Sequence, residues 1–471
     1  MRLCISAIVS ILAAMQPLSG GGWGDASAGR PILEFWTEAE YHASENNHVV
    51  IRDRQGRVYV GNGGVITYDG REWSKIDINQ AYGTRCLTLD EENRIWVGAI
   101  NELGYLDDNA SGQRHYHSLT HMVPEGVSIP DVWGVHRLHE KTLFVLTNGI
   151  LVWDGQAFSY TPLPAETRLF SFPFRGGIGI SQKGRGFWKW DGSQLLPVTL
   201  GGAEAESIAF VVPLKDGSEF LDPGKRLMRL KNGQLERVAT NAVPILENNA
   251  QLTMALPLPD GKICVVSFSR GVVILNPDLS IARIIDRSAG LPGLNCNRVY
   301  LDDRGNLWIA TQLAVIRTDA FASTSLFDKV NGFDAGRTIS LGINPDRILA
   351  LAAEGVLELR SSAEPYYGAS FKPVPGLGEI FFDSMRNPDG SILLSGLFRI
   401  MRLEGAAAHQ AYTADSQVDR LEPWKGPLLV ASDGLNIQLL ERGDQPRLVR
   451  TLLSNLPETV SDIAIDGRET L

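Results

Sequence analysis

The sequence predicts an all-β protein made of repeated four-stranded units. Three observations lead to this fold class. The 471 residues include 48 Gly and ten Trp, which suits tight turns and packed sheet faces. No long segment places apolar residues at the three- and four-residue spacing of an amphipathic helix. Short apolar or alternating segments instead recur along the chain, separated by Asn-Gly, Asp-Gly and similar turns.

Residues 49–76 contain one complete unit. Four short segments of β-branched, aromatic or alternating residues are separated by three turns, at Asp53–Gly56, Asn62–Gly64 and Asp69–Gly70. Tight turns between such segments predict four antiparallel strands in a meander. The first turn of the unit recurs roughly every 36–49 residues, which is the spacing of blades in a β-propeller.

The number of copies predicts how the blades are arranged. Seven copies lie within residues 31–320, so we expect one complete seven-bladed ring, as a domain of residues 29–320. Radial stacking buries both faces of a meander, and residues 32–36 are the candidate strand that closes the ring. Residues 321–471 hold about three and a half more copies, too few to close a ring. We therefore expect the first blades of a second propeller, truncated at the end of this chain.

Residues 1–28 have the features of a signal peptide. Arg2 precedes a mostly apolar segment, Cys4–Met15, and Ala26-Ser27-Ala28 fits cleavage before Gly29. The apolar segment is shorter than the ~20 residues of a membrane span, although an uncleaved anchor is the alternative. These features predict export to the periplasm or another extracytoplasmic compartment.

Charge and cysteine content exclude some classes of partner and cofactor. The formal net charge of −10 argues against binding of nucleic acid. Three cysteines follow the signal segment: Cys86, Cys264 and Cys296. An odd number provides no disulfide framework, and the spacing fits no zinc motif. Buried free thiols are the favoured interpretation, with a Cys264–Cys296 bridge as the alternative.

The clearest copy of the unit, Val299–Thr311 (VYLDDRGNLWIAT), resembles the two-component-regulator propeller repeat. Its lead-in, Gly290-Leu291-Pro292, also matches that family. Residues 68–73 (YDGREW) resemble the opening blade of such sensors. The resemblance covers nearly the whole mature chain and is specific at the first, second and seventh copies.

This resemblance implies a function. Members of the family are typically extracytoplasmic sensors in which two seven-bladed propellers precede an immunoglobulin-like triple-tyrosine domain, a transmembrane helix and a cytoplasmic output module. The chain would then be the ligand-sensing region of a membrane-bound receptor, with a small molecule or oligosaccharide as ligand. The full-length receptor would also have an output module, which is a histidine kinase, a nucleotide cyclase or a DNA-binding domain. The membrane contact and a homodimer would likewise belong to the full-length receptor.

Tryptophan positions separate expected core residues from candidate ligand-binding residues. Five tryptophans are expected at matching strand positions, packed between blades: Trp96, Trp153, Trp188, Trp190 and Trp308. Trp36, Trp133 and Trp424 fall outside this register. They are the candidate ligand-binding residues, able to stack on a sugar ring.

Two sets of polar residues are candidate metal sites. His115, His117 and His121 could supply three ligands, but solvent-facing residues on an outer strand and loop are the favoured interpretation. The segment from Asp107 to Gly112, with Asn109 and Ser111, fits the start of a calcium loop, yet Ser118 stands where such a loop needs Glu. A hairpin turn favours the same residues without a metal.

Motifs of catalysis are missing from the sequence. It has no Gly-x-Ser-x-Gly elbow, no His-Glu-x-x-His pair and no phosphate-binding glycine loop. We therefore expect no catalytic residue, no bound metal and no cofactor. Two alternatives to a sensor stay open. One is a secreted propeller enzyme, a lyase or hydrolase of polysaccharides or lactones, and the other is a protein-binding scaffold.

Overall fold

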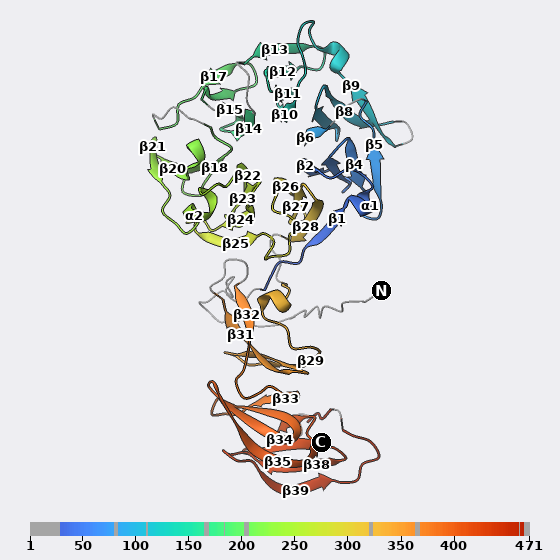
Figure 1. The fold of residues 1–471 in the computed structure, drawn as a ribbon, viewed down its shortest axis with the longest axis vertical. Coiled ribbons are helices and arrows are strands. Elements are labelled where there is room, and N and C mark those ends of the chain that lie inside the picture. The colour runs from blue at the N-terminus through green and yellow to red at the C-terminus, as the bar shows by residue number, and fades with distance from the viewer. Residues whose placement is uncertain are drawn as a thin grey trace. The chain divides into compact units, whose positions relative to one another are not determined.

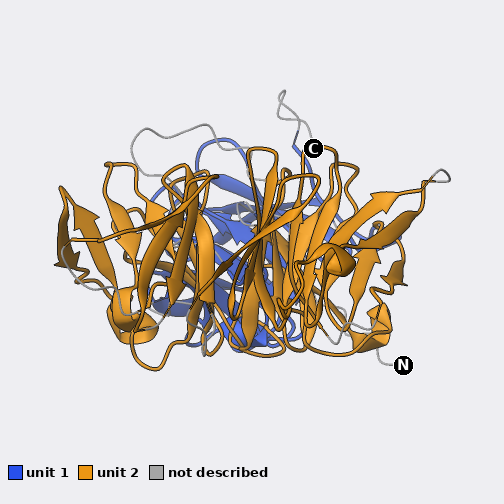
Figure 2. Cartoon of the chain, turned by 90° about the horizontal axis from the view of Figure 1, so that it is seen from above, with its two compact units in different colours: residues 1–30, 324–471 blue, residues 31–323 orange. Residues whose placement is uncertain are grey.

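The computed structural model describes residues 29–79, 83–109, 112–163, 169–182, 184–201, 207–319, 324–362, 368–460 and 462–465. Antiparallel strands dominate these residues, so the all-β prediction is confirmed. The chain forms two compact units, residues 31–323 and residues 1–30 with 324–471, which Figure 2 colours separately. No helix in the described ranges is long and apolar enough to cross a membrane. The expected signal peptide, residues 1–28, lies outside the described residues.

The larger unit, residues 31–323, contains seven four-stranded antiparallel sheets in its described part. The first two are β2 (Val49–Arg52), β3 (Val58–Gly61), β4 (Val65–Tyr68) and β5 (Trp73–Ile76), then β6 (Thr84–Leu89), β7 (Ile95–Ala99), β8 (Glu102–Asp108) and β9 (Arg114–Ser118). The next two are β10 (Val132–Leu138), β11 (Lys141–Leu146), β12 (Gly149–Trp153) and β13 (Phe158–Pro162), then β14 (Leu169–Phe174), β15 (Gly177–Gln182), β16 (Gly186–Trp190) and β17 (Leu195–Pro197).

The remaining sheets of the larger unit complete the series. They are β18 (Val211–Pro213), β19 (Glu219–Leu221), β20 (Met228–Lys231) and β21 (Gln234–Arg237), then β22 (Leu252–Pro257), β23 (Ile263–Ser267), β24 (Gly271–Leu275) and β25 (Ile281–Ile285), and finally β26 (Cys296–Leu301), β27 (Asn306–Thr311) and β28 (Ala314–Asp319) with β1 (Glu34–Thr37). Short helical segments lie between strands: α1 (Glu38–Tyr41), η2 (Thr120–Met122), η3 (Pro223–Lys225) and α2 (Val243–Leu246).

These sheets follow one another around a common centre, with the first strand of each sheet on the inside (Figure 1). First strands contact their neighbours in the order β2, β6, β10, β14, β18, β22 and β26, and β26 contacts β2 again. The N-terminal strand β1 pairs antiparallel with β28, with Phe35 opposite Ile316 and Trp36 opposite Val315. The strand expected at residues 32–36 is thus present as Glu34–Thr37 and joins the last sheet of the larger unit.

The smaller unit contains three sheets in its described part. They are β29 (Thr338–Ile343), β30 (Ile348–Ala352), β31 (Gly355–Ser361) and β32 (Ala369–Pro373), then β33 (Phe381–Arg386), β34 (Ile392–Glu404) and β35 (Ala407–Gln417), and finally β36 (Leu421–Pro423), β37 (Leu428–Asp433), β38 (Asn436–Glu441) and β39 (Arg447–Leu453). A short helical segment, η4 (Lys329–Asn331), precedes them. First strands again contact one another, β29 with β33 and β33 with β36.

An aspartate in the first turn explains the sequence motif of the clearest copy. The Oδ1 atom of Asp302 accepts hydrogen bonds from the backbone N–H groups of Arg304 (3.0 Å) and Asn306 (2.8 Å). Its Oδ2 atom accepts one from Nε1 of buried Trp308 at 3.1 Å. One carboxylate therefore satisfies the turn and the polar atom of a core aromatic residue.

The same arrangement recurs in the first and second sheets. Asp90 accepts from the backbone of Arg94 (2.8 Å) and from Nε1 of Trp96 (2.8 Å). In the first sheet Tyr59 replaces tryptophan, and its hydroxyl donates to Asp53 at 3.0 Å. The aspartate and the aromatic residue are six positions apart in each case, so the chemistry of the turn selects the residue types of the repeat.

The five tryptophans expected at one strand position occupy two. Trp96 and Trp308 lie in second strands, β7 and β27, where the turn aspartate binds them. Trp153, Trp188 and Trp190 lie in third strands, β12 and β16. The prediction of a single matching position is therefore wrong, because only the second-strand indoles are reached by that aspartate.

The turn aspartates make stability depend on acid pH. Burial alone would raise the pKa values of Asp53, Asp90 and Asp302, but their hydrogen bonds outweigh it and hold each pKa below its usual value. These carboxylates therefore stabilise the fold above about pH 4, and the contribution is lost as pH falls through their lowered pKa values in the folded state.

We expect the thermal unfolding midpoint to fall steeply below about pH 4. The slope should be shallower in Asp90→Asn and unchanged in the exposed control Asp77→Asn, and equal slopes in all three proteins would contradict this assignment.

Candidate functional site

In the described part of the larger unit, four of the first strands carry a β-bulge at their second residue. The pairing shifts between residues 84 and 86 in β6, 132 and 134 in β10, 252 and 254 in β22, and 296 and 298 in β26. The extra residues are Arg85, Trp133, Thr253 and Asn297. Bulges redirect side chains and are frequent beside functional sites. The recurrence of the bulges makes the N-terminal ends of the innermost strands a candidate site.

Two of the bulge residues, Arg85 and Trp133, lie together. The guanidinium carbon of Arg85 is 5.1 Å from the ring centroid of Trp133. Nε of Arg85 donates to Oδ1 of Asp131 at 3.0 Å, and Nη1 lies 2.8 Å from Nε2 of His48. We call these four residues the bulge cluster. The side chains of Arg85 and Asp131 keep 21% and 29% of their surface exposed, so a ligand could reach them.

The geometry of the bulge cluster defines its chemistry. A guanidinium group only donates hydrogen bonds, so Nε2 of His48 accepts from Arg85 and the proton of a neutral ring lies on Nδ1. Trp133 is anchored at its edge, because Nε1 donates to Oγ1 of Thr147 at 3.1 Å. The cluster combines a cation, a carboxylate, an imidazole and an indole, which together can bind hydroxyl groups and stack on an apolar ring face.

Of the three tryptophans predicted to bind ligand, only Trp133 lies in this cluster. Trp36, on outer strand β1, is stacked on Trp308 with ring centroids 5.7 Å apart and an interplanar angle of 15°, and it also packs on Tyr68 and Trp73. Trp424 follows β36 in the smaller unit and packs against the apolar cluster around Val430 and Ile437. These three residues are not brought together.

The sequence did not identify Arg85, Asp131 or His48. Arg85 is 46 residues from Asp131 and 37 residues from His48 along the chain, so no local motif connects the three residues. One feature of the sequence could have indicated the bulge positions: a polar or aromatic residue directly precedes the apolar part of several first strands. Arg85, Trp133 and Thr253 all have that position.

The histidines proposed as metal ligands lie on the outside of the second sheet. His115 and His117 are exposed on β9 with ring centroids 5.0 Å apart, and His121 lies in η2. Across the described ranges, no three His, Cys, Asp or Glu side chains are grouped so that they could hold a metal ion. In the proposed calcium loop, Oδ1 of Asn109 accepts from the backbone of Gln113 at 3.0 Å and closes the hairpin. Ser111 of that loop lies outside the described residues.

The three cysteines are free and buried. Burial raises the pKa of the Cys86 and Cys296 thiols to about 12 and also raises that of Cys264. Cys264 and Cys296 share one apolar cluster without forming the alternative disulfide. Such thiols pack as small apolar residues and are poor nucleophiles.

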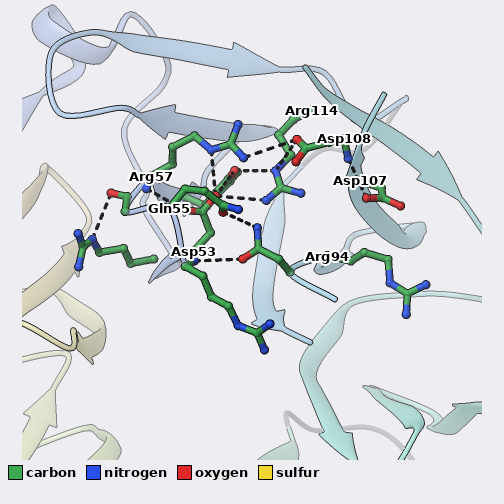
Figure 3. A network of polar contacts seen from close by, with 12 residues as sticks. Asp53, Gln55, Arg57, Arg94, Asp107, Asp108 and Arg114 are labelled. Atoms are coloured by element: carbon green, nitrogen blue, oxygen red, sulfur yellow. Dashed lines mark hydrogen bonds and ion pairs between the residues drawn. The ribbon is translucent and has the colours of Figure 1, made fainter. Parts of the chain in front are cut away.

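A dense polar network between the first and second sheets is shown in Figure 3. The fully buried carboxylate of Asp53 accepts from Nε of Arg57 (2.9 Å) and from Arg114 of β9 (3.2 Å). Nε of Arg114 also donates to the Tyr59 hydroxyl at 2.8 Å. Burial raises the pKa of Tyr59 to about 12. Each of these charges already has its partner, so the network joins neighbouring sheets and leaves no group free for a ligand.

The chain has similar structures among solved proteins. The chain matches no protein-family model and no curated protein sequence. Among solved structures it is similar to the extracellular domain of the putative hybrid two-component system BT4673 from B. thetaiotaomicron, with 13% identity, a TM-score of 0.48 and 93% of this chain covered. It spans 64% of that neighbour's length.

Two further solved structures are similar to a shorter share of this chain. Virginiamycin B lyase from Staphylococcus aureus has 11% identity and a TM-score of 0.47, with 62% of this chain and 99% of the lyase covered. The WD40 β-propeller domain of Doa1 has 12% identity and a TM-score of 0.47, with 63% and 98% covered.

By its own sheet order, the described chain is an all-β protein, and the circular contacts of first strands make the sheets of its larger unit propeller-like. Its neighbours include extracellular domains of the class of protein that the repeat motif resembles. At these identities the likeness concerns the fold alone.

Proposed function

We propose that this chain is the extracytoplasmic ligand-sensing region of a membrane-bound signal-transduction receptor. Residues 29–320 would form a complete seven-bladed propeller that binds the ligand, and residues 321–471 the first blades of a second propeller. The signal peptide, the periplasmic location, a homodimer and an output module downstream of this chain are parts of the same proposal. The motif of residues 299–311 and the circular order of first-strand contacts support it.

The bulge cluster is the observation that carries the proposed ligand site. It places a half-buried cation beside an indole at the inner edge of neighbouring sheets, where β6 contacts both β2 and β10. Aromatic rings with nearby charged hydrogen-bonding groups suit a small molecule or oligosaccharide rich in hydroxyl groups. Trp133 and Asp131 would make the decisive contacts.

Binding of a ligand panel tests this site. Titration calorimetry of the full chain against neutral and acidic oligosaccharides should identify a ligand. Its affinity should fall about 10- to 100-fold in Trp133→Ala and in Asp131→Asn, because central aromatic and charged contacts dominate such sites. The exposed control His117→Ala, on outer strand β9, should bind normally. Unchanged affinity in both cluster variants would place the site elsewhere.

One observation favours the alternative that the chain is a propeller enzyme, and the same ligands can be used to test for turnover. His48, Arg85 and Asp131 converge, as a lyase or hydrolase site would require. However, Nε2 of His48 is bound by Arg85, whereas a general base needs that lone pair for the substrate proton. We therefore expect binding without turnover, and release of cleaved product from any bound glycan would support the enzyme instead.

A further inference from the structure

The bulge residue of the last sheet, Asn297 on β26, has the same register position as Arg85 on β6 and Trp133 on β10. In each of these strands the second residue is the one left out of the pairing with the neighbouring strand. All three side chains are partly exposed. The same backbone feature therefore brings side chains of three sheets to the same end of the first strands.

The segment that leads into β2 connects Asn297 with the bulge cluster. Nδ2 of Asn297 donates to the backbone oxygen of Asn47 at 2.8 Å. The buried side chain of Asn47 in turn donates to the backbone oxygen of Thr311 at 3.1 Å, which holds this segment against the last sheet. The next residue is His48, whose Nε2 lies 2.8 Å from Nη1 of Arg85. Polar groups therefore follow one another from β26 to the bulge cluster.

The hydrogen bond to Asn47 also determines which way the amide group of Asn297 faces. A backbone carbonyl only accepts, so the amide nitrogen points toward Asn47 and Oδ1 points away from it. Within the described ranges of the chain, no hydrogen bond to this oxygen is present. Because the side chain is partly exposed, a hydroxyl group of a ligand can donate to it.

This row of polar and aromatic side chains has an end on each side. In the fourth sheet, β14 pairs with β15 without a bulge. In the sixth sheet the bulge residue is Thr253, which is buried and donates its hydroxyl to the backbone oxygen of Val266 at 3.4 Å. Four consecutive sheets thus contribute to the row. Packed sheets lie about 10 Å apart, so the row is longer than one sugar ring.

We propose that the ligand site extends from the bulge cluster to Asn297 and binds a linear, neutral oligosaccharide. One sugar ring lies against Trp133, and a hydroxyl group of a more distant ring donates to Oδ1 of Asn297. The charge of Arg85 is compensated by Asp131 at 3.0 Å, which favours hydroxyl groups over an anion. The inference rests on the proposed function and adds to it the length of the ligand and a further binding residue.

Titration calorimetry of the full chain tests the length of the site with linear malto-, cello- and xylo-oligosaccharides, from mono- to hexasaccharides. In a series that binds, affinity should rise from the disaccharide to the tetrasaccharide and then level off. Asn297→Ala should weaken binding of the hexasaccharide about 3- to 10-fold, as expected for one lost hydrogen bond between neutral groups. Binding of the disaccharide, which occupies the Trp133 end, should not change.

Thr253→Val is the matched control, because Thr253 has the same bulge position but is buried. Its affinity for the hexasaccharide should equal that of the parent protein. Hydrogen exchange of the parent protein gives a second readout that needs no variant. The hexasaccharide should protect the backbone around both Trp133 and Asn297, whereas the disaccharide should protect only the backbone around Trp133.

Two outcomes would overturn the inference and leave the proposed function intact. One is equal affinity for the disaccharide and the hexasaccharide, with binding still lost in Trp133→Ala. The other is hexasaccharide binding that leaves exchange around Asn297 unchanged and is as strong in Asn297→Ala as in the parent. Failure of the proposed function is different, because Trp133→Ala would then bind like the parent. Binding by no member of the three series would contradict both.

Discussion

Replacing Trp36 by alanine should reduce the free energy of unfolding by about 3 kcal/mol, the usual loss for a large aromatic residue removed from packed surroundings. Trp36 stacks on Trp308 and contacts the rings of Tyr68 and Trp73, so it joins the N-terminal strand to both the last and the first sheets. Urea unfolding of the full chain, followed by tryptophan fluorescence, measures the loss.

The neighbouring residue provides a matched control for this prediction. Phe35 lies on the same strand with 53% of its surface exposed, so Phe35→Ala should change stability by less than about 1 kcal/mol. A Trp36→Ala protein as stable as the parent would mean that the ring is not needed to hold β1. Its role as a ligand-binding residue, expected from the sequence, would then be the better explanation.

Replacing Asp302 by alanine should cost about 2–4 kcal/mol, because the backbone N–H groups of the turn and the buried Nε1 of Trp308 would lose their acceptor together. Asp302→Asn keeps one acceptor oxygen and should cost less. Thermal or urea unfolding of the full chain gives both values.

Asp303 is the matched control for this second prediction. It is the next residue, its side chain is 83% exposed, and it forms an ion pair with the guanidinium of Arg52 at 2.5 Å. An exposed ion pair contributes about 0–1 kcal/mol, so Asp303→Ala should be close to the parent. Equal losses at both positions would show that the turn is sensitive to any change and that the bond to Trp308 has no special role.

The repeat was readable from the sequence because its chemistry is local. Asp302 and Trp308 are six residues apart and both belong to one hairpin, so every copy that uses this bond must keep both residue types at that spacing. Turns with Gly, Asn and Asp mark the strand ends for the same reason. The copies with weaker motifs, such as β18 to β21, were still located by their turns.

The bulge cluster could be predicted from the sequence only in part. Trp133 was singled out because it departs from the repeat, and a bulge is such a departure. Arg85, Asp131 and His48 come from three different sheets or their connections and meet only when the first strands are placed side by side.

The sequence by itself determined the all-β class and the approximate strand positions, because turn chemistry and strand periodicity act over a few residues. The number of copies also indicated that the N-terminal strand joins the last sheet of the larger unit. Only the tertiary structure decided which polar residues share the inner edge of the larger unit. One-residue bulges redirect those side chains, and the burial and charge of a group depend on neighbours that lie tens of residues away in the chain.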